Sequence, residues 1–170
     1  YQAAEKGTLK NSAELIRQVD RMLADPRAEA FYHSFLSQWF ELHRFDDIAV
    51  NPDEYLMFDE QVRYSAREEP IRLFEHLMKK NLSLANLIDS DFAMLDPLLA
   101  HFYGIQGVEG QGFRKVSLSP ESPRGGLIGT TAFMIMGSTG DRTSPIIRGT
   151  LVLDKFLHDP SADPPPNVPE

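Results

Sequence analysis

Residues 141–157 read DRTSPIIRGTLVLDKFL, and they belong to the most informative part of the chain. Ser144 can cap a helix with its hydroxyl group, and Pro145 suits the first turn, where an amide hydrogen is not needed. The apolar residues that follow recur at helical spacing up to Leu157. The pattern therefore predicts a helix, and its apolar content predicts that the helix is largely buried.

Further segments flank this helix on both sides. Before it, residues 127–136 form an apolar run that fits either a buried helix or a buried strand. Residues 137–144 are rich in Gly, Ser and Thr, and we expect a loop there. After the helix, five prolines fall within residues 160–170, so residues 159–170 are predicted to form an extended, semi-rigid linker.

Two amphipathic helices are predicted near the N-terminus. Asn11 or Ser12 can cap the first, and Asp25-Pro26 supplies a cap and a first-turn proline for the second. Because the break between them is short, we expect a helical hairpin with both apolar faces in the core. The aromatic residues of the second helix also fit an exposed docking patch. The apolar positions are Leu15, Ile16, Val19, Met22 and Leu23 in the first helix, and Ala28, Phe31, Phe35, Trp39 and Leu42 in the second.

A long third helix is predicted over residues 55–77, but Pro70 lies inside it. Proline removes one internal hydrogen bond and clashes with the preceding turn, so we expect a kink or a restart there. The charged residues around Pro70 have the spacing of helix-surface ion pairs. They are Arg67, Glu68, Glu69, Arg72 and Glu75.

The remaining predicted elements are short. Residues 82–88 and 97–104 are predicted to be helices, and residues 108–119 a loop with one short strand that can pair into a hairpin. The expected fold class is therefore mainly α. It is a multi-helix bundle with helical hairpins, at most one short β-hairpin and a Pro-rich C-terminal extension.

Composition excludes several classes of function. The chain has 170 residues, 42% of them hydrophobic, and a net charge of −8, which suits a folded domain but not a nucleic-acid-binding protein. No apolar run is long enough for a transmembrane segment. Because cysteine is absent, the chain cannot form a disulfide or a covalent C-x-x-C-H haem attachment. Residues 1–20 lack the pattern of a signal peptide, so we expect the chain to begin inside a longer protein.

Five motifs, taken in order, carry a resemblance to a known family. They are Met22-Leu23-Ala24-Asp25-Pro26-Arg27, Phe102-Tyr103-Gly104-Ile105, Arg124-Gly125-Gly126-Leu127, Asp141-Arg142-Thr143-Ser144-Pro145-Ile146-Ile147-Arg148-Gly149 and Pro164-Pro165-Pro166-Asn167-Val168-Pro169. Together they resemble the large, secreted cytochrome-c-associated proteins of planctomycetes, whose domains are of unknown function. This resemblance favours a helix for residues 127–136.

The resemblance also implies a domain organisation and a cellular context. Residues 1–118 would be the C-terminal part of a helical domain, residues 119–158 the helix-loop-helix start of the following domain, and residues 159–170 the linker. In such proteins a C-x-x-C-H haem site typically follows the proline run. The full-length protein is then expected to carry c-type haem, with none bound within this chain, and to be periplasmic or extracellular.

Three arginines flank the loop at residues 137–144 and define a candidate binding site. Guanidinium groups beside a helix N-terminus suit an anion such as a carboxylate, a sulfate or a haem propionate. The alternative is that Arg142 pairs with Asp141 or with a backbone carbonyl and only braces the loop. No catalytic residue is predicted. The candidate cofactor-binding residues are Arg124, Arg142, Thr143, Ser144 and Arg148.

The five histidines are scattered and do not form a metal-binding pattern, so no metal site is predicted. His76 and His101 are candidate axial ligands for a haem carried elsewhere, although a lone helical histidine is more often packed or solvated. Met134 and Met136 are candidates for a haem edge or for core filling.

Two hypotheses of function remain open. In the first, which we prefer, the chain is a structural and docking module of an exported c-type-haem redox protein. It would dock the haem-bearing segment of the same polypeptide or a redox partner. In the second, it is part of a haem-dependent oxidoreductase that acts on an extracellular substrate, such as a polysaccharide-derived compound. Three arginines that converge in one pocket would favour ligand binding or catalysis, whereas arginines that fan outward or pair with backbone would favour the scaffold.

Overall fold

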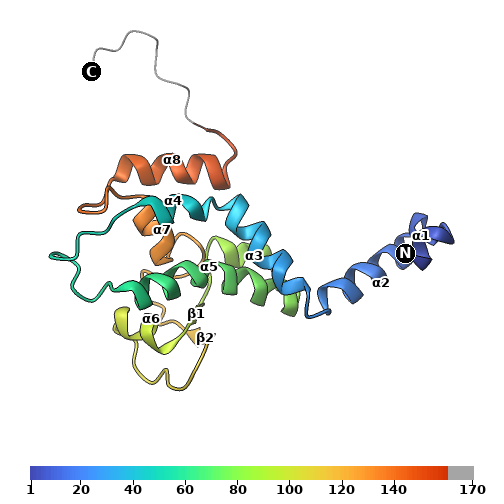
Figure 1. Cartoon of the computed structure of the whole chain (residues 1–170), viewed down its shortest axis with the longest axis horizontal. Coiled ribbons are helices and arrows are strands. Elements are labelled where there is room, and N and C mark those ends of the chain that lie inside the picture. The colour runs from blue at the N-terminus through green and yellow to red at the C-terminus, as the bar shows by residue number, and fades with distance from the viewer. Residues whose placement is uncertain (161–170) are drawn as a thin grey trace, which may run out of the picture.

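The computed structural model describes residues 1–160 of the chain and is 54% helical. Figure 1 shows a packed body and an arm, formed by α1 and α2, that projects from one end of the body. The predicted fold class, mainly α with one short pair of strands, is confirmed. In chain order the elements are α1 (Gln2–Glu5), the 3-10 helix η1 (Thr8–Lys10), α2 (Ser12–Leu23), α3 (Ala28–Trp39), α4 (Leu42–Asp47), α5 (Glu60–Lys80), the 3-10 helix η2 (Leu84–Leu87), β1 (Phe92–Leu95), α6 (Pro97–Phe102), β2 (Arg114–Ser117), α7 (Thr131–Met136) and α8 (Pro145–Phe156).

The arm carries an apolar stripe that the body does not cover. Asn11 caps α2 as predicted, since its side-chain oxygen accepts hydrogen bonds from two amides of the first turn. However, Ile16 is 61% exposed and Met22 is 60% exposed, and Leu15 and Val19 also face solvent. The turn at residues 24–27 leads the chain from the arm into the body and does not fold α2 back along α3 (Figure 1). The predicted hairpin with a buried apolar face on α2 is therefore wrong.

The buried face of α3 differs from the predicted one. Tyr32 and Leu36 are completely buried, and Ala28 is nearly so. Phe31 and Phe35 are 47% and 43% exposed, so they lie at the margin of the core. The predicted helix is confirmed, but its aromatic stripe is shared between the core and the solvent.

α5 is the central helix of the body, and it packs against α3, α6, α7 and β1. It runs without interruption through the buried Pro70, so the predicted restart is wrong. The elements packed around α5 hold the helix where the proline removes a hydrogen bond. Glu68 and Glu69 are 4% and 3% exposed, which contradicts their prediction as helix-surface residues.

β1 and β2 form a small antiparallel sheet in which Phe92 lies opposite Ser117. The strand predicted within residues 108–119 is thus found as β2. Its partner lies on the other side of α6 in the chain, so a helix and a loop connect the two strands in place of a tight turn. Asp96 caps α6 by accepting a hydrogen bond from the Leu99 amide.

The C-terminal helices form in the predicted order. The run at residues 127–136 is a tight turn followed by α7, and the hydroxyl group of Ser144 caps α8. Leu151 of α8 is buried, but Ile146 is 79% exposed. α8 lies along the outside of the body with one side on α7 (Figure 1), so the prediction of a largely buried helix is wrong.

One hydrophobic core contains residues from the earlier helices and from the segment after residue 126. The Phe40 ring at the end of α3 stacks on the Phe133 ring of α7, with the centroids 6.1 Å apart. Leu127 is also fully buried in this core. Residues after Leu127 therefore complete the core that the earlier helices begin. Residues 161–170, most of the predicted linker, lie outside the described residues.

Candidate functional site

A pocket of about 220 Å³ lies at the end of the body opposite the arm. Its walls come from the segment at residues 50–58, from α6, α7 and the start of α8, from the turn at Arg124, and from the loop at residues 137–144 (Figure 1). Within residues 1–160 the lining includes Arg124, Arg142 and Arg148 but neither aspartate nor glutamate. The pocket is therefore positive in a chain whose net charge is −8.

Arg124 is held on both sides. Its guanidinium group donates a hydrogen bond to the carbonyl of Gly129 at 3.1 Å. The guanidinium carbon lies 3.5 Å from the ring centre of Tyr103, a distance typical of a cation–π contact. Packing thus fixes the position of this positive charge at the pocket wall.

The side chains of Arg148 and Arg142 differ in how strongly they are held in position. Arg148 donates a hydrogen bond to the hydroxyl group of Thr143. Its Nε atom is buried and has no hydrogen-bond partner in the described part of the chain. Arg142 is 84% exposed, and its Nε lies 3.7 Å from the carboxylate of Asp141. Arg148 is therefore positioned by the loop, whereas Arg142 is free to reorient.

The loop at residues 137–144 is ordered by its own backbone. Ser138 and Thr143 pair as an isolated antiparallel bridge, and the Gly140 carbonyl accepts a hydrogen bond from the Asn51 amide at 3.1 Å. Gly140 has a φ of 90°, and a side chain there would overlap the carbonyl oxygen of Ala49. Glycine therefore lets this loop lie directly against the opposite wall of the pocket.

The turn that carries Arg124 rests on the segment before β1. The Gly126 amide donates a hydrogen bond to the hydroxyl group of Ser90 at 3.0 Å, and that hydroxyl donates to the Phe92 carbonyl at 2.6 Å. Gly126 has a φ of 60°, and a Cβ atom there would overlap the carbonyl of Ile88. The close approach of the backbone at Gly126 to the backbone at Ile88 thus determines where Arg124 enters the pocket.

A buried carboxyl group lies behind the pocket wall. The Oε2 atom of Glu69 on α5 accepts a hydrogen bond from the Tyr103 hydroxyl at 2.5 Å and one from the Thr131 amide at 3.2 Å. The Thr131 hydroxyl donates to the Tyr103 oxygen at 2.9 Å. Since Thr131 and Arg124 also line the pocket, they connect it to Glu69.

This environment changes the acidity of both groups. Burial raises the pKa of Glu69 to about 7, against the opposing effects of the hydrogen bonds from Tyr103 and Thr131 and of the charge on Arg124. The nearby Asp96 contributes a further rise to the pKa of Glu69. Burial and the charge of Glu69 raise the pKa of Tyr103 well above its ordinary value. Glu69 is therefore the group of this cluster that titrates near neutral pH.

The structure brings four of the five predicted site residues together. Arg124, Arg142, Thr143 and Arg148 line the same pocket. Ser144 is not among the described lining residues, and its hydroxyl group caps α8. The two alternatives therefore occur together. Arg124 and Arg148 form hydrogen bonds that stabilise the fold, and they also line the pocket with Arg142.

Sequence reasoning missed Glu69, Tyr103 and Thr131. Glu69 is 34 positions from Tyr103 and 62 positions from Thr131, so no local spacing relates them. The available signal was Tyr103 itself, which belongs to one of the motifs that carry the family resemblance. A glutamate beside a proline inside a helix gave no comparable indication.

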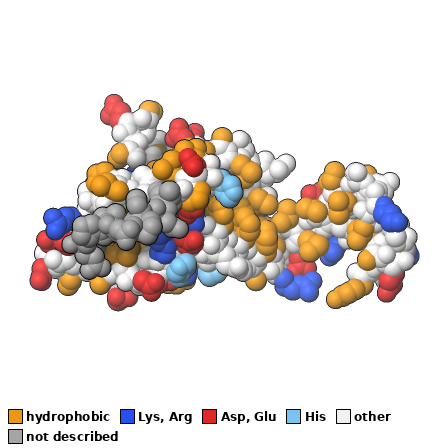
Figure 2. Space-filling view, turned by 90° about the horizontal axis from the view of Figure 1, so that it is seen from above, with side chains coloured by type: hydrophobic (Ala, Val, Ile, Leu, Met, Phe, Trp, Pro, Cys, Tyr) orange, Lys and Arg blue, Asp and Glu red, His pale blue; other side chains and the backbone are white. Residues whose placement is uncertain are grey.

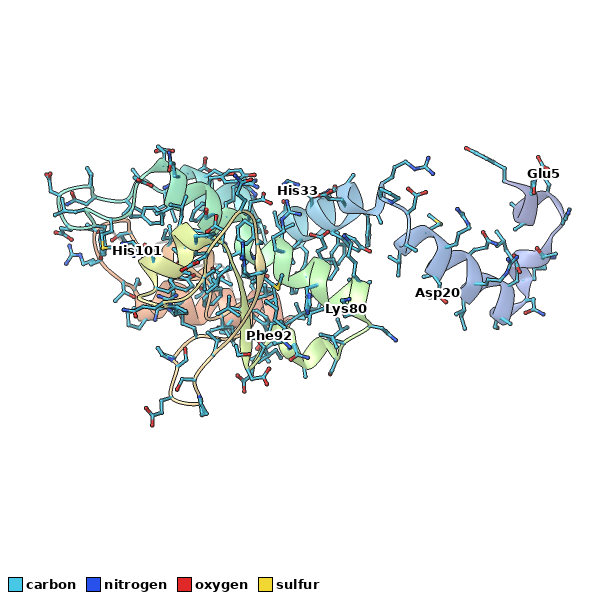
Figure 3. All side chains as sticks on the ribbon, turned by 90° about the horizontal axis from the view of Figure 1, so that it is seen from below. Glu5, Asp20, His33, Lys80, Phe92 and His101 are labelled. Carbon is cyan, nitrogen blue, oxygen red and sulfur yellow. The ribbon has the colours of Figure 1, made fainter. Side chains whose placement is uncertain are left out.

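The histidines do not contribute to this site. His76 packs edge-on against Phe92 with ring centroids 5.5 Å apart, and burial lowers its pKa. His101 lies on α6, at the end of the body away from the arm (Figure 3), and neither histidine is among the lining residues. Residues 1–160 contain no group of three or more His, Asp or Glu side chains placed to hold a metal ion.

A haem group does not fit the pocket. Sites for small molecules usually enclose about 300–1,000 Å³, and this cavity measures about 220 Å³. None of the described lining residues is a histidine, and the chain has no cysteine. Met134 lines the pocket, but Met136 is 2% exposed and belongs to the core. The pocket therefore suits a small anion or the carboxylate end of a larger group.

Comparison with protein families gives two matches. Residues 1–105 match the family described as PSD4, protein of unknown function (DUF1592), and residues 124–170 match PSCyt3, protein of unknown function (DUF1588). Both are cytochrome-c-associated domains of planctomycetes. No curated protein and no solved structure matches the chain. In the described part of the chain, no helix is both long and apolar enough to cross a membrane. Because the first match covers more than half of the chain, the protein belongs to the PSD4 family of proteins of unknown function (DUF1592).

Proposed function

We propose that this chain is a structural and docking module of an exported protein that carries a c-type haem, and that it has no complete active site of its own. The observation that carries the proposal is that both family matches are to cytochrome-c-associated domains. Since the chain has no cysteine, another segment of the same polypeptide or a redox partner would hold the haem. A periplasmic or extracellular location belongs to the proposal, because c-type haem is attached outside the cytoplasm.

In this proposal the arginine pocket is the docking point, and it receives a carboxylate from the haem-bearing segment or partner. Arg142 supports this role because its side chain is 84% exposed and can reach a second surface. Arg124 and Arg148 would then supply fixed positive charge inside the pocket. The division into residues 1–118, 119–158 and 159–170 remains part of the proposal.

The second candidate is that the chain forms part of a haem-dependent oxidoreductase with an extracellular substrate. The observation in its favour is Glu69, a buried carboxyl group with a raised pKa behind a pocket lined by three arginines. Perturbed carboxyl groups beside a cleft are frequent in active sites. Turnover of a polysaccharide-derived compound by the full-length protein would favour this candidate over the scaffold.

The decisive experiment is the visible absorption spectrum, taken as a pyridine haemochrome, of the natural full-length protein purified from its own cells. A c-type signature is expected. Its absence would remove both the scaffold proposal and the oxidoreductase proposal.

The docking role of the pocket has a separate test. Arg142→Ala in the full-length protein should alter the haem spectrum or the reduction potential while leaving the unfolding midpoint unchanged. Arg27→Ala is the control, since Arg27 is 87% exposed and lies at the start of α3, away from the pocket. A large loss of stability in Arg142→Ala would show that this arginine braces the fold instead.

A further inference from the structure

We infer that the arginine pocket binds a short aliphatic carboxylate together with a proton, with the anion on the three arginines and the proton on Glu69. The inference rests on the pocket that the proposed function uses, and it adds Tyr103 and Thr131 as the groups that connect the ligand to Glu69.

The charge of the pocket identifies the ligand as an anion. Three arginines and no acidic residue line it within residues 1–160. The Nε atom of Arg148 is buried and has no hydrogen-bond partner in that part of the chain. Because protein atoms cover this Nε, a carboxylate in the pocket would bind the terminal guanidinium nitrogens of the arginines.

The apolar part of the wall indicates the rest of the ligand. Phe58, Phe102 and Ile135 line the pocket beside the arginines, and carbon atoms form most of its lining surface. The cavity of about 220 Å³ is small, so it accepts a few carbon atoms in addition to a carboxylate. Guanidinium groups bind carboxylates through paired hydrogen bonds. A short aliphatic acid would contact both the arginines and the apolar wall.

Arg124 is the residue that couples this ligand to Glu69. Its guanidinium group lines the pocket and lies over the ring of Tyr103, whose hydroxyl group is bonded to Glu69. The positive charge of Arg124 favours the ionised form of Glu69. An anion that binds Arg124 reduces this effect and adds a second negative charge nearby. Binding should therefore draw a proton onto Glu69.

The other groups around Glu69 act in the same direction or remain neutral. Asp96, at the start of α6, is acidic and favours the protonated form of Glu69. Asp96 accepts a hydrogen bond from Ser65 of α5 at 2.5 Å. Tyr103, at the end of α6, keeps its own proton because its pKa is raised. In this cluster, Glu69 is left to take up the proton.

The test is isothermal titration calorimetry of this chain with sodium propionate at pH 6 and at pH 8.5. Propionate keeps its charge over this range, since simple carboxyl groups ionise near pH 4 to 5. Coupling between two sites is commonly about tenfold, and with Glu69 titrating near pH 7 it makes binding about sevenfold weaker at pH 8.5. Glu69→Gln should bind propionate equally at the two pH values.

Matched arginine variants locate the ligand. Arg142→Ala should weaken propionate binding at both pH values, whereas Arg27→Ala, of similar exposure at the other end of the body, should not. Absence of propionate binding, or binding that Arg142→Ala leaves unchanged, would overturn the inference. Equal affinity of the unmodified chain at pH 6 and pH 8.5 would also overturn it.

A second measurement does not depend on the folding of the Glu69 variant. Titrations of the unmodified chain at pH 7.5 in two buffers of different ionisation enthalpy should reveal uptake of roughly half a proton per propionate. Zero proton uptake would contradict the inference. A c-type haem signature combined with pH-independent propionate binding would overturn this inference and leave the proposed function in place.

Discussion

The hydroxyl group of Tyr103 donates a 2.5 Å hydrogen bond to the carboxylate of Glu69, and this bond joins the end of α6 to the middle of α5. Glu69 is 3% exposed, so water cannot replace its partners. Because the amide of Thr131 donates to the same oxygen, α7 is tied to this point as well. Three elements far apart in the sequence therefore meet at one carboxyl group.

The stability of the protein should depend on pH through Glu69. A pKa of about 7 in the folded chain, against 4.5 for an unperturbed glutamate, means that the folded state binds this proton more tightly. The contribution of Glu69 is full below pH 4.5 and is lost as the pH rises through 7, by at most about 3 kcal/mol. Urea unfolding between pH 5 and pH 8 measures this loss.

The Glu69→Gln variant should remove that fall in the free energy of unfolding. Glu121→Gln is the control, because Glu121 is exposed. If Glu69→Gln and the unmodified chain lose stability in parallel from pH 5 to pH 8, another group is responsible.

Gly140→Ala should damage the pocket more than the fold. The new methyl group would overlap the Ala49 carbonyl and would require a φ of 90°, so the loop at residues 137–144 must move. We expect a loss of about 1–3 kcal/mol in thermal unfolding and the loss of propionate binding. Gly149→Ala is the matched control, since its Cβ atom would meet open space on α8 and should stabilise the helix by about 0.5–1 kcal/mol. Unchanged propionate binding in Gly140→Ala would mean that the loop position does not matter for the site.

Arg72→Ala should be among the more destabilising charge deletions. Arg72 lies 2.9 Å from a carboxylate oxygen of Glu29, 2.9 Å from one of Glu75 and 3.0 Å from one of Glu68. Because the Glu68 side chain is only 5% exposed, removing Arg72 leaves a buried negative charge, at a cost of about 3 kcal/mol. Urea denaturation at pH 7 measures it.

Arg67→Ala is the control for this charge cluster. Its side chain has the same 27% exposure as that of Arg72, but it pairs with Asp46, which is 45% exposed. Its removal should cost less than about 1 kcal/mol. Equal losses for the two variants would show that burial of Glu68 is not what makes Arg72 important.

Removal of residues 124–170 should abolish cooperative folding, even though this segment matches a separate family. Leu127 and Phe133 are completely buried, and Phe133 stacks on Phe40 from the other segment. Without them, the core of α3 to α5 would be open to water. Circular dichroism during heating should show a broad, weak transition for the shortened chain, and a sharp transition would indicate that residues 1–123 fold alone.

The apolar stripe on α2 was predicted to be buried but is exposed in the structure. Leu15, Ile16, Val19 and Met22 have the spacing of a core face, yet they project from the arm into solvent. Figure 2 shows hydrophobic side chains gathered on the surface where the arm joins the body. The spacing of the apolar residues shows that one face of the helix is apolar. Whether another element covers that face depends on the direction that the chain takes after residue 24.

Local chemistry explains why several other features could be predicted. The caps at Asn11, Asp96 and Ser144 act on amides two or three positions away, and the glycine at 104 follows α6 with a φ of 72°. Such interactions operate within one turn of chain, so the residues that make them are adjacent in the sequence. The mainly α fold class follows from the same local information.

From the sequence alone, the longer helices, the caps at Asn11, Asp96 and Ser144, and the arginines beside the polar loop could be predicted. Packing between distant parts of the chain determines that α2 stands apart, that α5 continues through Pro70 and that Glu69 lies behind the arginine pocket. In each case the neighbouring elements determine the outcome. For Glu69 they exclude water, and this burial raises the pKa of its carboxyl group. Neither the residue type nor its spacing carries that information.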